Sequence, residues 1–270
     1  MPVEERFPRP SVMGVVNVTP DSFSDAGVNF RPGDAIATAG RMVAEGSAIV
    51  DIGGESTRPG SDPVPLDEEL RRVLPVLEAI AGELPFSIDT AKAEVARRAV
   101  GLGAELVNDV TALRGDPALA GVVAESGVYL CLMHMLGEPR TMQRDPRYDD
   151  VVSEVKAFLE ERLRFAVAEG IAEEYVCLDP GIGFGKTVEH NFELVRRLGE
   201  LTALGRPLVV GFSRKSSLGK ILGDPDAKTG QLSASIAAAV AAYERGATIL
   251  RVHDVREHVE ALTAARAVVG

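Results

Sequence analysis

The chain has 270 residues, of which 46% are hydrophobic and 26% are charged, the balance of an ordinary soluble domain. Its net charge of −11 argues against a nucleic-acid-binding protein, because such proteins usually carry a basic surface. No apolar run is long enough to predict a transmembrane helix, and residues 1–6 lack the layout of a signal peptide. We therefore expect a cytoplasmic protein with neither a nucleic-acid nor a membrane partner.

Apolar, strand-like runs alternate with amphipathic helical patterns along the whole chain. The predicted strands are Val12–Val16, Ile49–Ile52, Phe86–Ile88, Leu106–Asn108, Val128–Met133, Tyr175–Leu178, Leu208–Gly211 and Thr248–Val252. The predicted helices are Gly33–Glu45, Asp67–Gly82, Ala91–Gly101, Pro117–Ser126, Asp149–Gly170, Glu189–Leu198, Gly230–Arg245 and Val255–Val268. Cys131 and Cys177 lie inside apolar runs, so we expect buried thiols rather than a disulfide.

This alternation predicts an α/β protein with the (β/α)8 (TIM) barrel fold, in one domain that spans residues 1–270. A doubly wound open sheet is the alternative, but it usually has fewer strands. In a barrel the active site lies at the C-terminal ends of the strands. The residues that follow the predicted strands are mostly polar: Asn17, Gly53–Arg58, Asp89, Asn108, His134, Asp179, Ser213–Lys215 and Arg251–His253.

Three of these strand-end residues suit a ligand edge that is rich in N–H donors. Asp89, Asn108 and Asp179 offer two carboxylates and a carboxamide, which together fit a guanidine-like heterocycle. For Asp179 and Asn108 a turn-capping role is the alternative. Asn17 either stabilises a turn or offers its oxygen to a hard cation such as Mg²⁺, which needs only one or two protein oxygens.

The last two predicted strands are followed by cationic residues. Arg251 and His253 alternate, so they can face one side as an anion clamp, although an ion pair of Arg251 with Asp254 or another carboxylate is the alternative. Lys215 can bind a carbonyl or phosphate group or act as a Schiff-base nucleophile.

Other sequence features give weaker indications. Gly181, Gly183 and Gly185 are spaced like a phosphate-binding loop. His190 and His258 lie on helical patterns, so we expect them at the surface, and the role of His134 is open.

Several long segments, taken together, resemble the dihydropteroate synthase family of folate biosynthesis. They are Met13–Asp25, Asp51–Gly60, Ser87–Thr90, Asn108–Asp109, Leu132–Met135, Asp179–Lys186, Ser213–Ser216 and Arg251–Val255. The resemblance implies a transferase that joins 6-hydroxymethyl-7,8-dihydropterin diphosphate to 4-aminobenzoate through a pterin carbocation. The products are 7,8-dihydropteroate and pyrophosphate. It also implies Mg²⁺ as cofactor, a homodimer and a sulfonamide target.

The resemblance assigns roles to individual residues. It implies a pterin pocket of Asp89, Asn108, Met133, Asp179, Phe184, Lys215 and Arg251. It implies a pyrophosphate site of Asn17, Arg251 and His253, with Asn17 on the metal. It implies an aminobenzoate site of Phe23, Thr57, Arg58, Pro59 and Ser216. The catalytic residues it implies are Asp25, Asp89, Lys215 and Arg251.

Three alternatives stay open at this point. The first is a pterin-binding methyltransferase domain that serves a corrinoid protein, and the second is a catalytically silent pterin-binding module. The third, more distant, is an aldolase with a Schiff base on Lys215.

Overall fold

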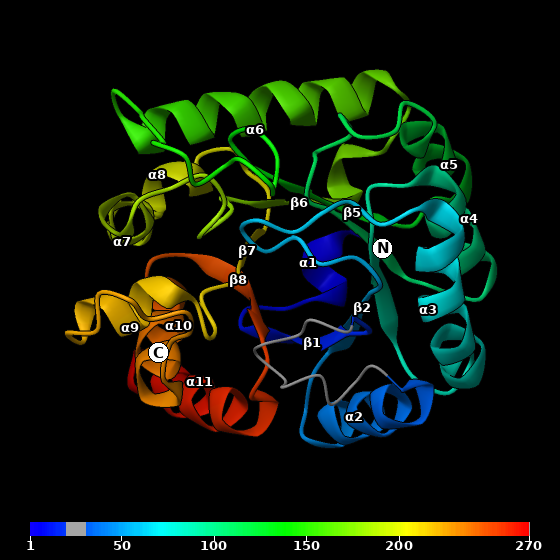
Figure 1. The fold of residues 1–270 in the computed structure, drawn as a ribbon, viewed down its shortest axis with the longest axis horizontal. Coiled ribbons are helices and arrows are strands. Elements are labelled where there is room, and N and C mark those ends of the chain that lie inside the picture. The colour runs from blue at the N-terminus through cyan, green and yellow to red at the C-terminus, as the bar shows by residue number, and fades with distance from the viewer. Residues whose placement is uncertain (20–30, 270) are drawn as a thin grey trace.

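The computed structural model of the protein describes residues 1–19 and 31–269. Parallel strands β1 to β8 form a closed barrel in chain order, and β8 pairs with β1. The strands are β1 (Ser11–Asn17), β2 (Ile49–Gly53), β3 (Phe86–Asp89), β4 (Leu106–Asp109), β5 (Tyr129–Met133), β6 (Val176–Asp179), β7 (Leu208–Val210) and β8 (Ala247–Val252). Figure 1 shows the helices arranged as a ring around these strands.

The long helices connect successive strands and confirm the predicted (β/α)8 architecture. They are α2 (Pro32–Ala44), α3 (Leu66–Ile80), α4 (Ala93–Gly101), α5 (Leu119–Ser126), α6 (Val151–Ala168), α7 (Val188–Arg196), α10 (Leu232–Glu244) and α11 (Val255–Val269). Four short elements were not predicted, because each is too short to show a helical period: α1 (Val3–Arg6), η2 (Glu173–Tyr175), α8 (Gly199–Thr202) and α9 (Ser216–Ile221). No helix within the described residues is long and apolar enough to cross a membrane.

The inside of the barrel changes from apolar to polar along the strands. Near the strand starts, buried side chains that include Met13, Ile49 and Ile249 form one apolar cluster, and Val3 and Phe7 from the α1 region complete it. Because inward-facing side chains recur every second residue, the next inward layer contains Asp51 and Arg251. The fold therefore places a charged layer directly above this apolar cluster, at the mouth of the barrel.

The cysteines are buried and unbridged, as predicted, and are register partners on β5 and β6. The prediction that His258 lies at the surface is wrong. His258 is fully buried, and its Nδ1 lies 2.6 Å from the carbonyl oxygen of Asp254. It shares one face of α11 with the buried residues Val255 and Leu262, and this position decides its burial. His190 is partly buried and forms a capping box with Thr187.

Candidate active site

Side chains from four strands meet in one hydrogen-bond network at the barrel mouth. Arg251 donates from Nε to Asp51 Oδ2 over 2.7 Å and from Nη2 to Asp89 Oδ2 over 2.8 Å. Asn108 Nδ2 donates to Asp51 Oδ2 over 2.9 Å, and Ser87 Oγ donates to Asp51 Oδ1 over 2.7 Å. The structure thus brings together three predicted pterin-pocket residues, Asp89, Asn108 and Arg251.

Asp51 is the centre of this network, and the sequence analysis gave it no role. It is fully buried and accepts hydrogen bonds from Ser87, Asn108 and Arg251. A usable signal was present, because an aspartate inside the apolar run Ile49–Ile52 must find partners. Since these contacts hold Arg251 and Asn108 in place, Asp51 positions both of them.

The network sets the protonation of its members. Burial raises the pKa of Asp89 to about 7, and the nearby Asp51 carboxylate adds to this shift while Arg251 opposes it. Burial disfavours the charged form of Arg251, but the carboxylates of Asp51 and Asp89 outweigh burial and raise the pKa of the guanidinium. Arg251 is therefore a permanent cation, whereas Asp89 can change its charge near neutral pH.

Asn17 ends β1 beside the same network. A Cβ atom on Gly53 would lie 3.7 Å from Asn17 Oδ1 and 3.6 Å from Asp89 Oδ2. Two hard oxygen donors, one on each of two strands, therefore face the same small space above Gly53.

Asp179, at the end of β6, combines the two roles that the sequence left open. Its Oδ1 accepts the Gly181 N–H over 2.7 Å, which makes it a turn residue. Its Oδ2 makes no hydrogen bond within residues 1–19 and 31–269, so it can accept one from a ligand. The turn after β4 is capped by Asp109, which accepts the N–H groups of Thr111 and Leu113. Asn108 therefore does not cap this turn, and its side chain bonds to Asp51 instead.

The glycine-rich segment Gly181–Gly185 does not form a phosphate cradle. The N–H of Gly183 donates to Asn191 Oδ1, and that of Phe184 donates to the carbonyl of Gly181. The carbonyls of Gly181 and Phe184 both accept from Lys186 Nζ over 3.0 Å. The segment therefore encloses an internal cation instead of an external anion.

His134 completes the surroundings of Lys186 and thereby acquires a role. Its Nδ1 lies 2.8 Å from Lys186 Nζ, and both side chains are buried. Burial lowers the pKa of His134 to about 2, and the Lys186 charge acts in the same direction, so the ring is neutral and accepts from the ammonium. Gly181 has φ +68°, and a Cβ there would lie 1.9 Å from the His134 carbonyl oxygen, so only glycine fits.

The predicted lysine and apolar walls of the pocket also come together. Lys215 Nζ lies 4.3 Å from the centre of the Phe184 ring, and Phe184 packs on the cluster that contains Met133. Burial lowers the pKa of Lys215 to about 8, and the charge of Arg251 adds to this shift. Lys215 therefore holds its proton only weakly for a lysine.

His253 follows the end of β8 and lies next to Ser213. His253 Nδ1 lies 3.2 Å from Ser213 Oγ. Burial lowers the pKa of His253, and positive charges that include Arg58 contribute. The charge of Arg58 also lowers the pKa of Lys215, after burial and the charge of Arg251.

Of the remaining predicted aminobenzoate and catalytic residues, some lie within the described part of the chain and others do not. Thr57 is partly buried, Pro59 is exposed, and Ser216 begins α9 directly after Lys215. The structure pairs Asp254 with Arg214 (Nε to Oδ2, 3.0 Å) rather than with Arg251. Phe23 and Asp25 lie outside the described residues.

One known protein family matches most of the chain. The model of the pterin-binding enzyme family matches residues 13–253. The chain belongs to this family.

Relatives within the family match almost the full length of the chain. Dihydropteroate synthase of Escherichia coli K12 is 48% identical over 94% of this chain and 89% of its own length. The dihydropteroate synthase of Synechocystis is 47% identical over 92% of this chain and 86% of its own.

Two solved structures are similar in fold and sequence. Yersinia pestis dihydropteroate synthase, in a sulfonamide drug complex, has a TM-score of 0.91 and 45% identity over 96% of this chain and 94% of its own. Xanthomonas albilineans dihydropteroate synthase with 4-aminobenzoic acid has a TM-score of 0.88 and 47% identity over 98% of this chain and 94% of its own.

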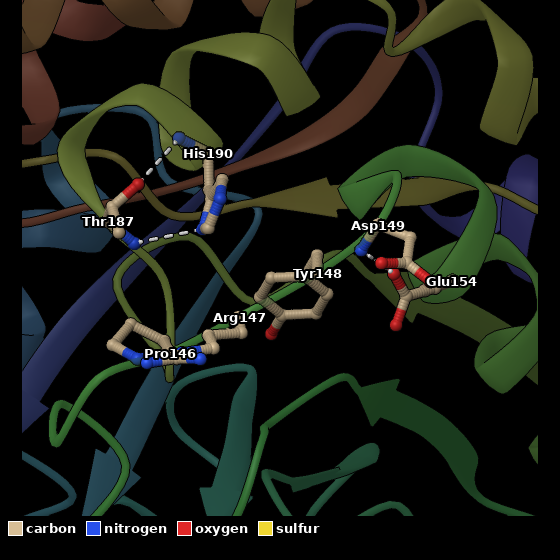
Figure 2. A pocket seen from close by; sticks show the side chains of 7 residues that line it. All are labelled: Pro146, Arg147, Tyr148, Asp149, Glu154, Thr187 and His190. Atoms are coloured by element: carbon tan, nitrogen blue, oxygen red, sulfur yellow. Dashed lines mark hydrogen bonds between the residues drawn. The ribbon is translucent and has the colours of Figure 1, made fainter.

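An open groove is lined by the chain before α6, by Glu154 on α6 and by the start of α7 (Figure 2). Its lining includes Tyr148, Glu154, Thr187 and His190. The polar groups drawn there are used internally: Thr187 and His190 cap α7, and Glu154 accepts the Asp149 N–H over 2.7 Å. Tyr148 Oη donates to the Gly185 carbonyl over 2.8 Å, so one side of the groove is hydrogen-bonded to the Gly181–Lys186 segment and helps to hold it.

Proposed function

We propose that this chain joins the methylene of 6-hydroxymethyl-7,8-dihydropterin diphosphate to the amine of 4-aminobenzoate, forming 7,8-dihydropteroate and pyrophosphate. The observation that carries the proposal is the polar layer of Asp51, Asp89, Asn108 and Arg251 at the barrel mouth. This layer belongs to a chain whose near-full-length relatives are named dihydropteroate synthases. One solved relative, from Xanthomonas albilineans, has 7,8-dihydropteroate bound.

The chemistry of the pocket suits a pterin. Asp179 Oδ2, Asp89 and the Asn108 carboxamide supply acceptors for ring and amino N–H groups, and Lys215 supplies a donor for the ring carbonyl. Met133 and Phe184 supply apolar walls, and the Arg251 guanidinium is suited to pack over a flat ring. A pterin therefore meets both its polar edge and its faces in one site.

The bond-breaking step follows from the charges around the diphosphate. The C–O bond to the diphosphate breaks, and its electron pair leaves with pyrophosphate, which Arg251, His253 and Asn17 would hold. The methylene is left as a pterin-stabilised cation, which the negative charges of Asp89 and Asp25 would favour. The amine of 4-aminobenzoate then attacks this carbon and loses one proton. Because an aniline is nucleophilic toward a cation, no strong general base is needed.

We place the aminobenzoate at Phe23, Thr57, Arg58, Pro59 and Ser216. The charge of Arg58 at the mouth supports this assignment, because the substrate carries a carboxylate. Since the Yersinia pestis relative binds a sulfonamide drug, we expect sulfonamides to compete with 4-aminobenzoate here.

The oxygen donors at Gly53 fit a magnesium ion. Asn17 Oδ1 would supply a protein ligand, Asp89 Oδ2 lies nearby but already accepts from Arg251, and phosphate oxygens and waters would supply the rest. The described residues contain no group of three His, Cys, Asp or Glu side chains suited to a metal. When bound, Mg²⁺ would neutralise charge on the leaving pyrophosphate.

The deciding experiment measures pyrophosphate release by the purified protein. We expect release that requires both the pterin diphosphate and 4-aminobenzoate, with dihydropteroate formed in equal amount. Release without 4-aminobenzoate, or no release with both, would contradict the proposed function. Chelation with EDTA should abolish the release and added Mg²⁺ should restore it.

We also propose a cytoplasmic homodimer. Unbridged Cys131 and Cys177 suit a reducing compartment, and α10 combines a small, alanine-rich sequence with the exposed Leu232 near its start. A helix of small residues lets a second copy approach closely. Light scattering should therefore give twice the mass of the chain, and Ala237→Glu at an exposed position of α10 should shift the protein toward the monomer.

A further inference from the structure

A second cluster of charges, centred on the buried Glu69 and two half-buried partners, lies just outside the proposed pterin pocket. Lys92 Nζ donates to carboxylate oxygens of both Glu55 and Glu69. Thr90 Oγ1 donates to Glu69 Oε1 over 2.7 Å and accepts the Lys92 N–H over 3.2 Å. We call Glu55, Glu69 and Lys92 the anchor triad. Its members have no role in the chemistry proposed above.

The anchor triad joins three separate parts of the fold. Glu55 lies in the loop after β2, Glu69 on α3, and Lys92 between β3 and α4. Lys92 follows the end of β3 at Asp89 by only three residues. The triad therefore links the strand that carries Asp89 to the loop that carries Thr57 and Arg58.

The chain is also fixed immediately before Glu55. The carbonyl oxygen of Gly54 accepts from Arg72 Nη1 over 2.9 Å. A Cβ on Gly54 would lie 2.7 Å from Val73 Cγ1 and 3.0 Å from Glu69 Cγ, so the backbone packs directly on α3. Gly54 and Glu55 together determine where the loop leaves the barrel.

The loop itself has no helix or strand between Gly53 and Leu66. Its internal contacts are local, such as the 3.0 Å approach of the Ser56 and Ser61 hydroxyl oxygens. Beyond Glu55 the loop contacts the Pro139 carbonyl through the Gly60 N–H over 3.0 Å. Thr57 and Arg58 lie between these two attachments, so a shift of Glu55 would move them.

The burial of Glu69 is costly, which suggests that the triad serves position rather than stability. Glu69 is fully buried, and this burial raises its pKa although Lys92 and Thr90 oppose the shift. An apolar residue would pack α3 on the barrel at lower cost, whereas a buried ion pair fixes one geometry.

We propose that Lys92, held between Glu55 and Glu69, is a positioning residue for the 4-aminobenzoate site. Lys92 acts through the loop that carries Thr57 and Arg58 and touches neither substrate. The inference rests on the proposed function, because it assumes that this loop binds the second substrate. It separates the two halves of the site: most pterin residues lie on strands or directly after them, and the aminobenzoate half depends on the triad.

The test compares steady-state kinetics of wild type, Lys92→Met and Lys92→Arg. For Lys92→Met we expect the KM for 4-aminobenzoate to rise about tenfold, while the KM for the pterin diphosphate stays within about twofold. Lys92→Arg keeps the charge and can reach both carboxylates, so it should recover most of the loss. Equal rises in both KM values, or no rise in either, would overturn the proposal.

Two further variants keep the test decisive. Arg71→Met removes an exposed ion pair with Glu68 on α3, the helix that carries Glu69. This control variant should leave both KM values unchanged. If Lys92→Met does not fold, Glu55→Gln decides, because it preserves size and the Lys92–Glu69 contact. A selective rise in the 4-aminobenzoate KM supports the proposal, and unchanged kinetics overturn it.

Hydrogen exchange gives a readout that is independent of activity. Backbone amides of residues 55–65 should exchange faster in Lys92→Met than in Arg71→Met, while β3 stays protected. Unchanged exchange in this loop would also overturn the inference. Failure of the proposed function looks different, because wild type itself would then form no dihydropteroate.

Discussion

Individual carboxylates at the barrel mouth do different work, and their hydrogen bonds show which. Both carboxylate oxygens of Asp51 accept hydrogen bonds from protein donors, whereas in Asp179, among the described residues, only Oδ1 does, from the Gly181 N–H. In Asp89 one carboxylate oxygen, Oδ2, accepts a hydrogen bond from Arg251. Asp51 is therefore a positioning residue, and Asp179 and Asp89 have capacity left for a ligand.

Replacing Asp179 should separate ring recognition from anion binding. In Asp179→Asn the amide oxygen can keep the Gly181 contact, so the NH₂ group faces pterin donors. We expect the affinity for free 6-hydroxymethylpterin to fall by about 2–4 kcal/mol. His253→Ala should instead weaken pyrophosphate binding and spare the free pterin. Calorimetry with each ligand checks both, and wild-type pterin affinity in Asp179→Asn would reduce Asp179 to a turn residue.

The activity of the free enzyme should depend on pH in both directions. Asp89 loses its charge as pH falls through about 7, and Lys215 loses its charge as pH rises through about 8. Since both charges serve the pterin site, kcat/KM for the pterin diphosphate should peak between these values. Lys215→Arg should abolish the alkaline fall because arginine stays protonated, and Lys220→Arg, an exposed change on α9, should keep it.

At the scale of elements, the Gly181–Gly185 segment is a rigid wall built around one lysine. Lys186 holds two of its carbonyls, Tyr148 holds that of Gly185, and Gln143 donates to that of Gly183 over 2.7 Å. These contacts place Phe184 under Lys215. The wall of the proposed pterin pocket therefore depends on the internal contacts of Lys186.

Lys186 should also make stability depend on pH. Burial lowers its pKa in the folded state to about 7, below the value of about 10.4 expected when unfolded. The unfolded chain thus binds more protons between these values, and stability from this group rises with pH across them. Urea unfolding should give wild type about 2 kcal/mol more stability at pH 9 than at pH 7 from this group.

Lys186→Met should lose this pH-dependent gain and unfold more easily at both pH values, because two carbonyls lose their donor. Lys220→Met on the surface should keep the gain. An unchanged slope in Lys186→Met would mean that another group carries it.

At the scale of the whole molecule, the two proposed substrate sites are built on different kinds of structure. The proposed pterin residues Asp89, Asn108 and Asp179 end strands of the closed barrel. The proposed aminobenzoate residues Thr57, Arg58 and Pro59 lie on a loop without regular structure. Closure of the barrel therefore places most of the first site and leaves the second to the loop.

This difference predicts ordered binding. 4-Aminobenzoate alone should bind weakly, and a pterin together with pyrophosphate and Mg²⁺ should raise its affinity about tenfold or more, because they order the second half of the site. Calorimetry with and without these ligands measures the difference. Equal affinity in both conditions would contradict an ordered mechanism.

The sequence alone determined the architecture and most of the site, because both follow from local patterns. Strand and helix periods are local, and in a parallel barrel the polar residues after the strands must meet at one end. The family resemblance then implied Asp89, Asn108, Asp179, Lys215 and Arg251 as pocket residues. The structure joins Asp89, Asn108 and Arg251 in one network and places Lys215 over Phe184.

Only the tertiary structure decided which buried charges are partners. Arg251 and Asp51 are separated by 200 residues, and Lys186 and His134 by 52, so no local period connects them. The same holds for Lys92, which reaches Glu55 across 37 residues. A buried charge requires a partner, but closure of the barrel chooses it, since closure sets which side chains lie within hydrogen-bond distance.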